Sequence, residues 1–122
     1  MKKLMTLCLL GASLLTGTAQ NSVSKTWVSD LGNGTYKNPV LYADYSDPDI
    51  CRVGDDYYMT ASSFNCLPGL PILPSKDLVN WTISGHAVAS SLAPHSNTRP
   101  QHGNHIWAPC IRHHNGEFYI YW

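Results

Sequence analysis

Charge is scarce in this sequence, and neither sign prevails. Charged side chains make up 13% of its residues, and eight Lys and Arg residues balance eight Asp and Glu residues. Proteins that bind nucleic acid or anionic membrane surfaces carry a basic patch, so neither partner is expected here. Aromatic residues make up 11%, and a neutral, aromatic-containing surface suits an uncharged ligand better.

Cysteine is also scarce, with four residues. Cys8 lies in an N-terminal segment that we expect to be removed, and the remaining three cannot form a closed disulfide framework. Cys51 lies within an apolar run and Cys110 beside one, so both are predicted to be buried free thiols. A Cys51–Cys110 disulfide is the alternative. Cys66 lies in a predicted loop, where its thiol could be exposed.

Long apolar runs are absent except at the N-terminus, where residues 4–15 form one. Basic residues precede this run and small residues follow it at 16–20, which is the pattern of a secretory signal peptide. The run is too short to span a bilayer. We therefore predict a bacterial signal peptide at 1–20 and a secreted or periplasmic protein. Loss of Lys2 and Lys3 would leave six basic and eight acidic residues. The alternative is a buried N-terminal helix.

No stretch after residue 20 has the 3.6-residue apolar period of a helix, so the predicted fold class is all-β. Residues 21–37 are polar and form a lead-in to a domain at 38–122. Asn115 and Gly116 lie between apolar runs, which is a strong hairpin signal, and residues 54–56 have similar turn chemistry. Residues 64–71 are expected to form a loop, residues 75–78 a turn and residues 87–105 a long connection. The expected strands are 50–53, 57–62, 72–73, 81–84, 106–113 and 117–122.

The two predicted hairpins repeat one pattern at an offset of about 61 residues. A proline, a strand, a turn and an aromatic strand recur in the same order, with two strand candidates between the copies. The matched pairs are Pro48 with Pro109, Ile50 with Ile111, Tyr57 with Phe118, Tyr58 with Tyr119 and Met59 with Ile120. A four-stranded unit repeated at this spacing indicates a β-propeller. Propellers need at least about four blades, so we expect a piece of a longer protein. The alternative is chance similarity between two hairpins.

Several motifs resemble one known family. The sequence reads SDPDI at 46–50 and GDDYY at 54–58, after NPV at 38–40. Further along it reads SKDLVNW at 75–81 and IWAP at 106–109. Together these segments resemble the first two blades of glycoside hydrolase family 43, which comprises secreted β-xylosidases, α-L-arabinofuranosidases and arabinanases.

The resemblance covers residues 38–122 and implies a five-bladed β-propeller. This sequence would supply the first blade and the start of the second. The resemblance further implies an inverting glycosidase without a cofactor. Its substrate would be an oligosaccharide or polysaccharide that contains xylose or arabinose.

The resemblance also assigns roles to single residues. Asp47 matches the general base of the family, and Phe64 and Trp107 match aromatic residues that line the sugar subsite. The general acid and a carboxylate that tunes its pKa would lie beyond Trp122. The family often has an aspartate where this sequence has Cys110, which leaves the subfamily open.

Each of these roles has a plainer alternative. An aspartate before a strand often caps a turn, and Asp47 could do only that. When the two copies of the repeat are aligned, Asp47 matches Ala108. A carboxylate present in only one copy is expected for a functional residue and not for one that maintains the repeat. Asp44 and Asp49 are its competitors, and we interpret Asp49 as a neighbour of the base on the same strand face. Phe64 and Trp107 could be core aromatics, although Pro- and Gly-interrupted loops favour sugar stacking.

Four histidines lie close together in the sequence, at positions 102, 105, 113 and 114. His113 and His114 are adjacent and so point to opposite faces of a strand. No cysteine or carboxylate completes a closed zinc set, so no metal site is predicted. His105 is instead a candidate to hydrogen-bond a sugar hydroxyl beside Trp107.

The sequence thus predicts hydrolysis of O-glycosidic bonds in pentose-containing plant saccharides, with Asp47 as general base. Two other functions remain open. One is a propeller that binds glycans without cleaving them. The other is an enzyme of the fructan-hydrolase type, in which the corresponding aspartate is a nucleophile and the anomeric configuration is retained. The GDDYY and WAP motifs argue against this last function.

Overall fold

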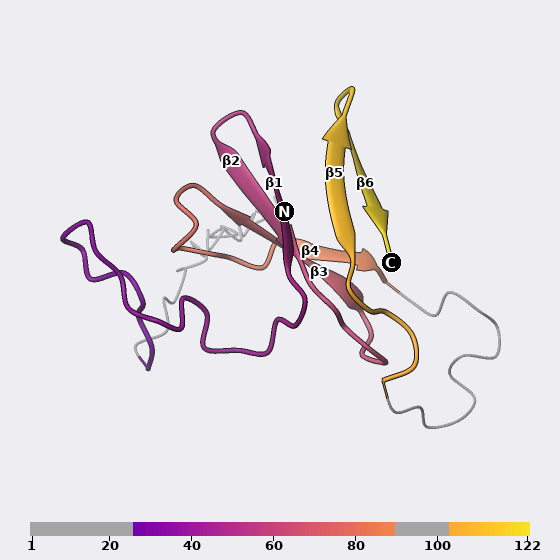
Figure 1. Ribbon diagram of the computed structural model, residues 1–122, viewed down its shortest axis with the longest axis horizontal. Coiled ribbons are helices and arrows are strands. Elements are labelled where there is room, and N and C mark those ends of the chain that lie inside the picture. Colours follow the sequence, from indigo (N-terminus) through magenta and orange to yellow (C-terminus); the bar gives the residue numbers. More distant parts are fainter. Residues whose placement is uncertain (1–25, 90–102) are drawn as a thin grey trace, which may run out of the picture.

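The computed structural model describes residues 26–89 and 103–122, which form six β-strands. Four strands make one antiparallel sheet and two make a separate hairpin (Figure 1). The predicted signal peptide and most of the predicted connection at 87–105 lie outside the described residues. Within the described ranges there is no helix long and apolar enough to cross a membrane. The strands are β1 Asp49–Val53, β2 Asp56–Thr60, β3 Gly69–Ser75, β4 Gly85–Val88, β5 Cys110–His114 and β6 Glu117–Tyr121.

The first sheet is a meander in the order β1-β2-β3-β4. Val53 pairs with Asp56, so the β1–β2 loop contains only two residues. Gly54 takes the first loop position with a φ of 62°. A two-residue loop with a left-handed first position matches the right-handed twist of the flanking strands, and glycine adopts that φ without strain. The predicted hairpin is therefore confirmed.

The bounds of one predicted strand in this sheet, and the position of another, were wrong. β3 begins at Gly69, not residue 72, and so includes Pro71 of the predicted loop at 64–71. The fourth strand is Gly85–Val88 and not 81–84. Thr82 donates its N–H to the carbonyl of Pro74, but Pro74 has no N–H with which to return the bond. A continuous ladder between β3 and β4 therefore forms only on the N-terminal side of Pro74.

The hairpin of β5 and β6 turns at Asn115 and Gly116, as predicted. Both residues have positive φ values, 50° and 84°, which is the type I′ turn that this dipeptide favours. β5 begins at Cys110 rather than at the predicted residue 106, because Ile106 forms a bridge with Phe64 of the first sheet instead.

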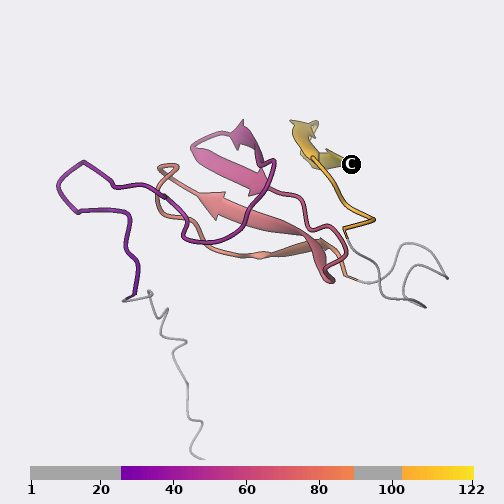
Figure 2. The ribbon, with the colours of Figure 1, turned by 60° about the horizontal axis from the view of Figure 1, so that its bottom comes forward.

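The predicted repeat is confirmed by the register of the two hairpins. Asp49 pairs with Thr60, and Cys110 pairs with Tyr121, 61 residues later in each case. The hairpins lie side by side, with β5 next to β1 and with both turns at the same end of the molecule (Figure 1). Figure 2 shows the same hairpins from a second direction, one beside the other above the β3–β4 part of the sheet. The second hairpin is thus a copy of the first, placed next to it.

Part of the core joins the sheet to the second hairpin. Leu70 of β3, Val88 of β4 and Ile106 form a buried cluster, and Ile120 of β6 packs against it. Gly69 permits this packing, because a Cβ atom at this position would lie 2.7 Å from Cδ1 of Ile106. A glycine is therefore needed where Ile106 approaches β3 most closely.

The predicted lead-in contains local structure within its described part. Asp30 bridges Tyr36, and Lys37 donates its N–H to the carbonyl of Ser29 at 3.0 Å. The side-chain amide of Asn80 donates to Asp30 and also to Asp77, each at 2.8 Å. These bonds attach the lead-in to the loop that follows β3.

Candidate active site

Asp47 lies immediately before Pro48 at the start of the first blade-like sheet. Its φ of 48° is left-handed, a conformation that few residue types other than glycine adopt, with aspartate among those enriched in it. Ala108 occupies the matching place before Pro109 in the second copy, with a φ of 40°. The backbone bend therefore belongs to the repeat, while the carboxylate is present in one copy only.

Two serine hydroxyls hold the carboxylate of Asp47. Its Oδ2 accepts from Ser62 Oγ at 3.1 Å and from Ser46 Oγ at 3.2 Å. Ser62 is buried, whereas Asp47 is exposed. Both bonds go to one oxygen, so among the described residues Oδ1 is left to accept from water or from a ligand.

The segment that contains Ser62 is paired with the segment before β5. Phe64 donates its N–H to the carbonyl of Ile106 at 2.9 Å, and Ile106 donates back to Phe64 at 3.0 Å. Ala108 donates its N–H to Ser62 Oγ at 2.8 Å. Residues 62–64 and 106–108 are therefore held together, although more than 40 residues separate them in the sequence.

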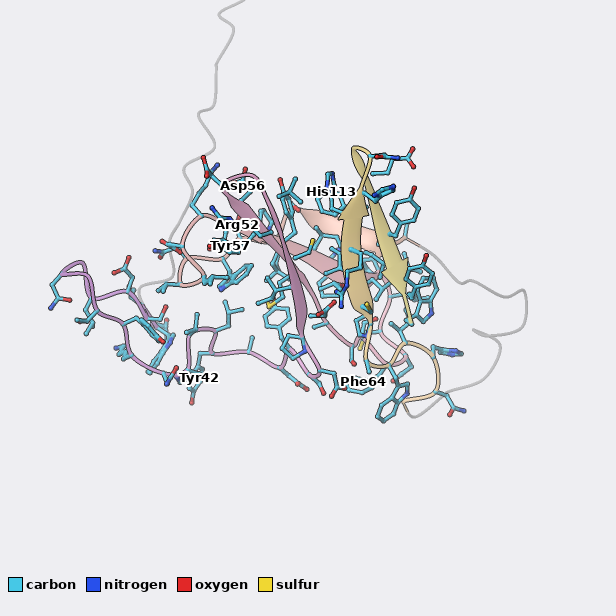
Figure 3. All side chains as sticks on the ribbon, turned by 45° about the horizontal axis from the view of Figure 1, so that its top comes forward. Tyr42, Arg52, Asp56, Tyr57, Phe64 and His113 are labelled. Carbon is cyan, nitrogen blue, oxygen red and sulfur yellow. The ribbon has the colours of Figure 1, made fainter. Side chains whose placement is uncertain are left out.

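Phe64 and Trp107 meet on these two segments. Their ring centroids lie 4.8 Å apart with an interplanar angle of 83°, an edge-to-face arrangement that stabilises aromatic pairs. Trp107 is 55% exposed, and its indole N–H donates to the carbonyl of Gly103. Figure 3 shows Phe64 at the end of the molecule opposite Asp56 and His113, which lie in strands close to the turns of the two hairpins. The pair is a surface feature and not part of the buried core.

The carboxylate of Asp49 binds groups of β5 instead of facing the candidate site. Its Oδ2 accepts from the N–H of Ile111 at 2.7 Å and from the Arg112 guanidinium at 2.5 Å. Burial raises the pKa of this carboxyl, but the hydrogen bonds from Ile111 and Arg112 outweigh it and leave the pKa below its usual value. Asp49 thus links β1 to β5 through its side chain. Its position two residues after Asp47 in the sequence did not reveal this role.

The remaining acidic residues near the motif lie elsewhere. Asp56 forms an ion pair with Lys76 at 2.5 Å, and Asp55 lies 3.7 Å from Arg52 at the β1–β2 turn. Asp55 is a turn residue, as interpreted from the sequence, whereas Asp56 is the first residue of β2 and not part of the turn. Asp44 is exposed. Among these aspartates, Asp47 is the one whose carboxylate bonds to Ser62, in the segment 62–64 that pairs with 106–108.

His105 is exposed, two positions before Trp107, and its imidazole forms no hydrogen bond with another described residue. His102 lies outside the described residues. In the part of the chain that the structure describes, no cluster of three or more His, Cys, Asp or Glu residues could hold a metal ion.

The three cysteines in the described ranges are free. The alternative of a Cys51–Cys110 disulfide is therefore not realised. Cys51 and Cys110 are half-buried, and Cys66 is exposed in its loop as predicted. Burial raises the pKa of the Cys51 thiol, so this thiol stays protonated.

An apolar pocket of about 350 Å³ lies beside Pro48, and neither Asp47 nor the aromatic pair lines it. It is bounded by Val40 and Tyr45 of the chain before β1 and by Ile50, Met59 and Trp81. Its lining contains no carboxylate or other charged side chain.

Sequence reasoning missed the role of Ser62. The sequence predicts Ser62 only as the last residue of a strand at 57–62, and nothing in its local sequence distinguishes it from Ser63. The available signal was the pair of serines at 62 and 63 where the predicted strand ends, because hydroxyls that become buried need partners.

A four-stranded meander followed by a hairpin of identical register defines successive blades of a β-propeller, with a carboxylate and an aromatic pair at one end. The sequence model of Glycosyl hydrolases family 43 matches residues 36–122. The chain therefore belongs to glycoside hydrolase family 43.

Relatives agree with this assignment. The chain is 50% identical over 95 residues to a β-xylosidase from Formosa agariphila, covering 75% of this chain and 16% of the relative. It is 41% identical over 101 residues to a non-reducing end α-L-arabinofuranosidase from Bacteroides ovatus, covering 77% of this chain and 18% of the relative. The crystal structure of the family 43 protein BlXynB from Bacillus licheniformis matches with a TM-score of 0.59 and 44% identity, covering 70% of this chain and 16% of that one. The chain thus spans less than a fifth of the length of these relatives.

Proposed function

We propose that this chain is the N-terminal part of a glycosidase that hydrolyses O-glycosidic bonds in xylose- or arabinose-containing plant saccharides. The names of the relatives support this substrate class. The observation that carries the proposal is the position of Asp47, whose carboxylate is fixed by Ser62 beside the segments that present Phe64 and Trp107.

The proposed reaction inverts the anomeric carbon. One ionised carboxylate takes a proton from water while a protonated acid donates to the leaving oxygen, and about 6.5–9.5 Å between the two carboxyl groups admits that water. Asp47 would be the general base, with Oδ1 accepting from the attacking water. The general acid, and a carboxylate that tunes its pKa, would be supplied by later blades of the full-length protein.

Phe64 and Trp107 would bind the sugar ring at this site. A flat aromatic face offers apolar contact to the C–H groups of a sugar, and the exposed face of Trp107 suits this role. His105 would donate a hydrogen bond to a sugar hydroxyl. We also propose that residues 1–20 direct the protein to the periplasm or the outside of the cell, which the mass of the mature N-terminal peptide would test.

The test of the proposal is Asp47→Asn in the full-length protein, assayed with an aryl β-xyloside and an aryl α-L-arabinofuranoside. Asparagine keeps the shape but cannot take a proton, so kcat should fall about 100-fold or more. Asp44→Asn is the matched control, because it removes one exposed carboxylate three residues away and should leave kcat unchanged. Equal turnover by the Asp47 variant and the wild type would refute the assignment.

Product stereochemistry separates the proposal from a retaining mechanism of the fructan-hydrolase type. The proposal predicts that the first sugar released has the inverted anomeric configuration, as read by NMR before mutarotation. A non-catalytic glycan-binding propeller is the second candidate, and the exposed side chain of Trp107 is compatible with it. Binding of a xylo-oligosaccharide by the full-length wild type without any release of product would favour that candidate.

A further inference from the structure

We propose that Ser62 is a positioning residue that fixes Asp47 for the reaction and couples it to the segment that carries Trp107. This inference rests on the proposed function of Asp47. It concerns a residue that neither the family motifs nor the repeat pattern single out.

The hydrogen-bond directions at Ser62 are determined by its partners. Ala108 approaches Ser62 Oγ with a backbone N–H at 2.8 Å, and an N–H group can only donate. The hydroxyl hydrogen is therefore directed to the other partner, Oδ2 of Asp47, at 3.1 Å. One hydroxyl thus accepts from the second blade and donates to the carboxylate of the first.

Ser62 is itself held rigidly. It is 7% exposed, and its N–H donates to the carbonyl of Ser46 at 3.0 Å. The next residue, Ser63, donates its N–H to the carbonyl of Ile106 at 3.3 Å. The other donor to Asp47, Ser46 Oγ, has no second partner among the described residues. Ser62 is therefore the better-anchored of the two hydroxyls.

The position of Ser62 relates the two copies of the repeat. Asp47 and Ala108 are equivalent residues with left-handed φ values of 48° and 40°, and the hydroxyl of Ser62 bonds to both. Ala108 is adjacent to Trp107, whose ring centroid lies 4.8 Å from that of Phe64. A shift of the 106–108 segment would consequently move both the sugar-stacking face and the partner that orients the base.

The first test is Ser62→Ala in the full-length protein, with kcat and KM measured for an aryl pentoside. Loss of a hydrogen bond to a charged group should lower kcat about 10-fold, while KM changes about twofold or less because the aromatic face remains. Ser63→Ala is the matched control. Ser63 is similarly buried at 9%, but its hydroxyl accepts from the N–H of Leu70 and does not contact Asp47, so its kcat should stay near that of the wild type.

The second test is a double-mutant cycle with Asp47→Asn. If Ser62 acts through the carboxylate, Ser62→Ala should cost little further activity once Asp47 is replaced. Ser62→Cys provides a second variant if Ser62→Ala does not fold. Cysteine has nearly the same shape but makes weak hydrogen bonds, so kcat should fall while the thermal transition is retained.

The outcomes separate this inference from the proposed function. A Ser62→Ala enzyme with wild-type kcat, or kcat losses that multiply in the double variant, would overturn the role of Ser62 and leave Asp47 as the base. Equal kcat losses in Ser62→Ala and Ser63→Ala would also overturn it. Wild-type activity of Asp47→Asn would overturn the proposed function, and the inference with it.

Discussion

The contact between Asp49 and β5 should make a measurable contribution to stability. Ile111 is 1% exposed, so its N–H has no access to water, and Asp49 Oδ2 accepts from it at 2.7 Å. A hydrogen bond to a charged group contributes about 1.5–3 kcal/mol. The ion pair with Arg112 adds less, because the side chain of Arg112 is 59% exposed and such pairs contribute about 0–1 kcal/mol.

We therefore expect Asp49→Ala to lower the free energy of unfolding of the full-length protein by about 2–3 kcal/mol. Arg112→Ala, which leaves the buried N–H satisfied, should lower it by about 1 kcal/mol or less. Denaturant unfolding of both variants at pH 7 measures the difference. If the two variants are equally stable, the hydrogen bond from the buried N–H of Ile111 does not dominate the contribution of Asp49 to the free energy of unfolding. That result would refute the reasoning.

The same contact has a pH dependence with a defined sign. The pKa of Asp49 is lower in the folded protein than in the unfolded chain, because the bonds from Ile111 and Arg112 outweigh burial. Its stabilisation is therefore fully present above about pH 4, the unfolded value, and is lost as the pH falls through the folded pKa. Asp49→Asn should remove this part of the acid dependence, which a comparison of unfolding curves between pH 2 and pH 6 would show.

Three further predictions concern packing and the sugar subsite. Gly69→Ala would place a Cβ atom 2.7 Å from Ile106 and 2.9 Å from Ser63, and the overpacking should cost about 1–3 kcal/mol in thermal unfolding. Gly85→Ala is its control, with no atom within 4 Å, and an equal loss there would contradict the packing argument. Trp107→Ala should raise KM for an aryl pentoside about 10-fold, whereas Tyr36→Ala, which removes another exposed aromatic, should not. Residues 21–122 alone should neither unfold cooperatively nor hydrolyse a pentoside. The reason is that Phe118 and Tyr121 of the edge strand β6 are 44% and 65% exposed. A sharp thermal transition of this fragment would disprove the prediction.

The two hairpins could be predicted from the sequence because their information is local. Asn115 and Gly116 both adopt positive φ, and Gly54 does so in the first turn; these residues specify such turns in any context. The offset of 61 residues then predicted that the registers would match, and they do. Local turn chemistry and an internal repeat were together enough for the blade architecture.

The middle strands could not be predicted in the same way. Residues 64–71, which include Pro71, were predicted as a loop, yet Pro71 lies in β3. Pairing with β2 and β4 and burial of Leu70 and Leu73, 0% and 1% exposed, outweigh the local preference. Strand propensity reflects burial and cross-strand packing more than the backbone itself, and these are tertiary quantities.

The candidate site shows the same division. Asp47, Phe64 and Trp107 were identified through motifs, but the contacts that organise them were not. Ser62 and Ala108 are 46 residues apart, and Asp49 and Ile111 are 62 apart. No local pattern encodes such bonds, because they form only when the second blade docks against the first.

The central claim is that Asp47 removes a proton from the attacking water, and anion rescue tests it most directly. Azide has no proton to lose, so it needs no base. In the full-length Asp47→Ala variant, added azide should restore turnover of an aryl pentoside and give a glycosyl azide of inverted configuration, with no such effect on the wild type. An Asp47→Ala enzyme that hydrolyses the substrate with water at the wild-type rate would contradict the claim.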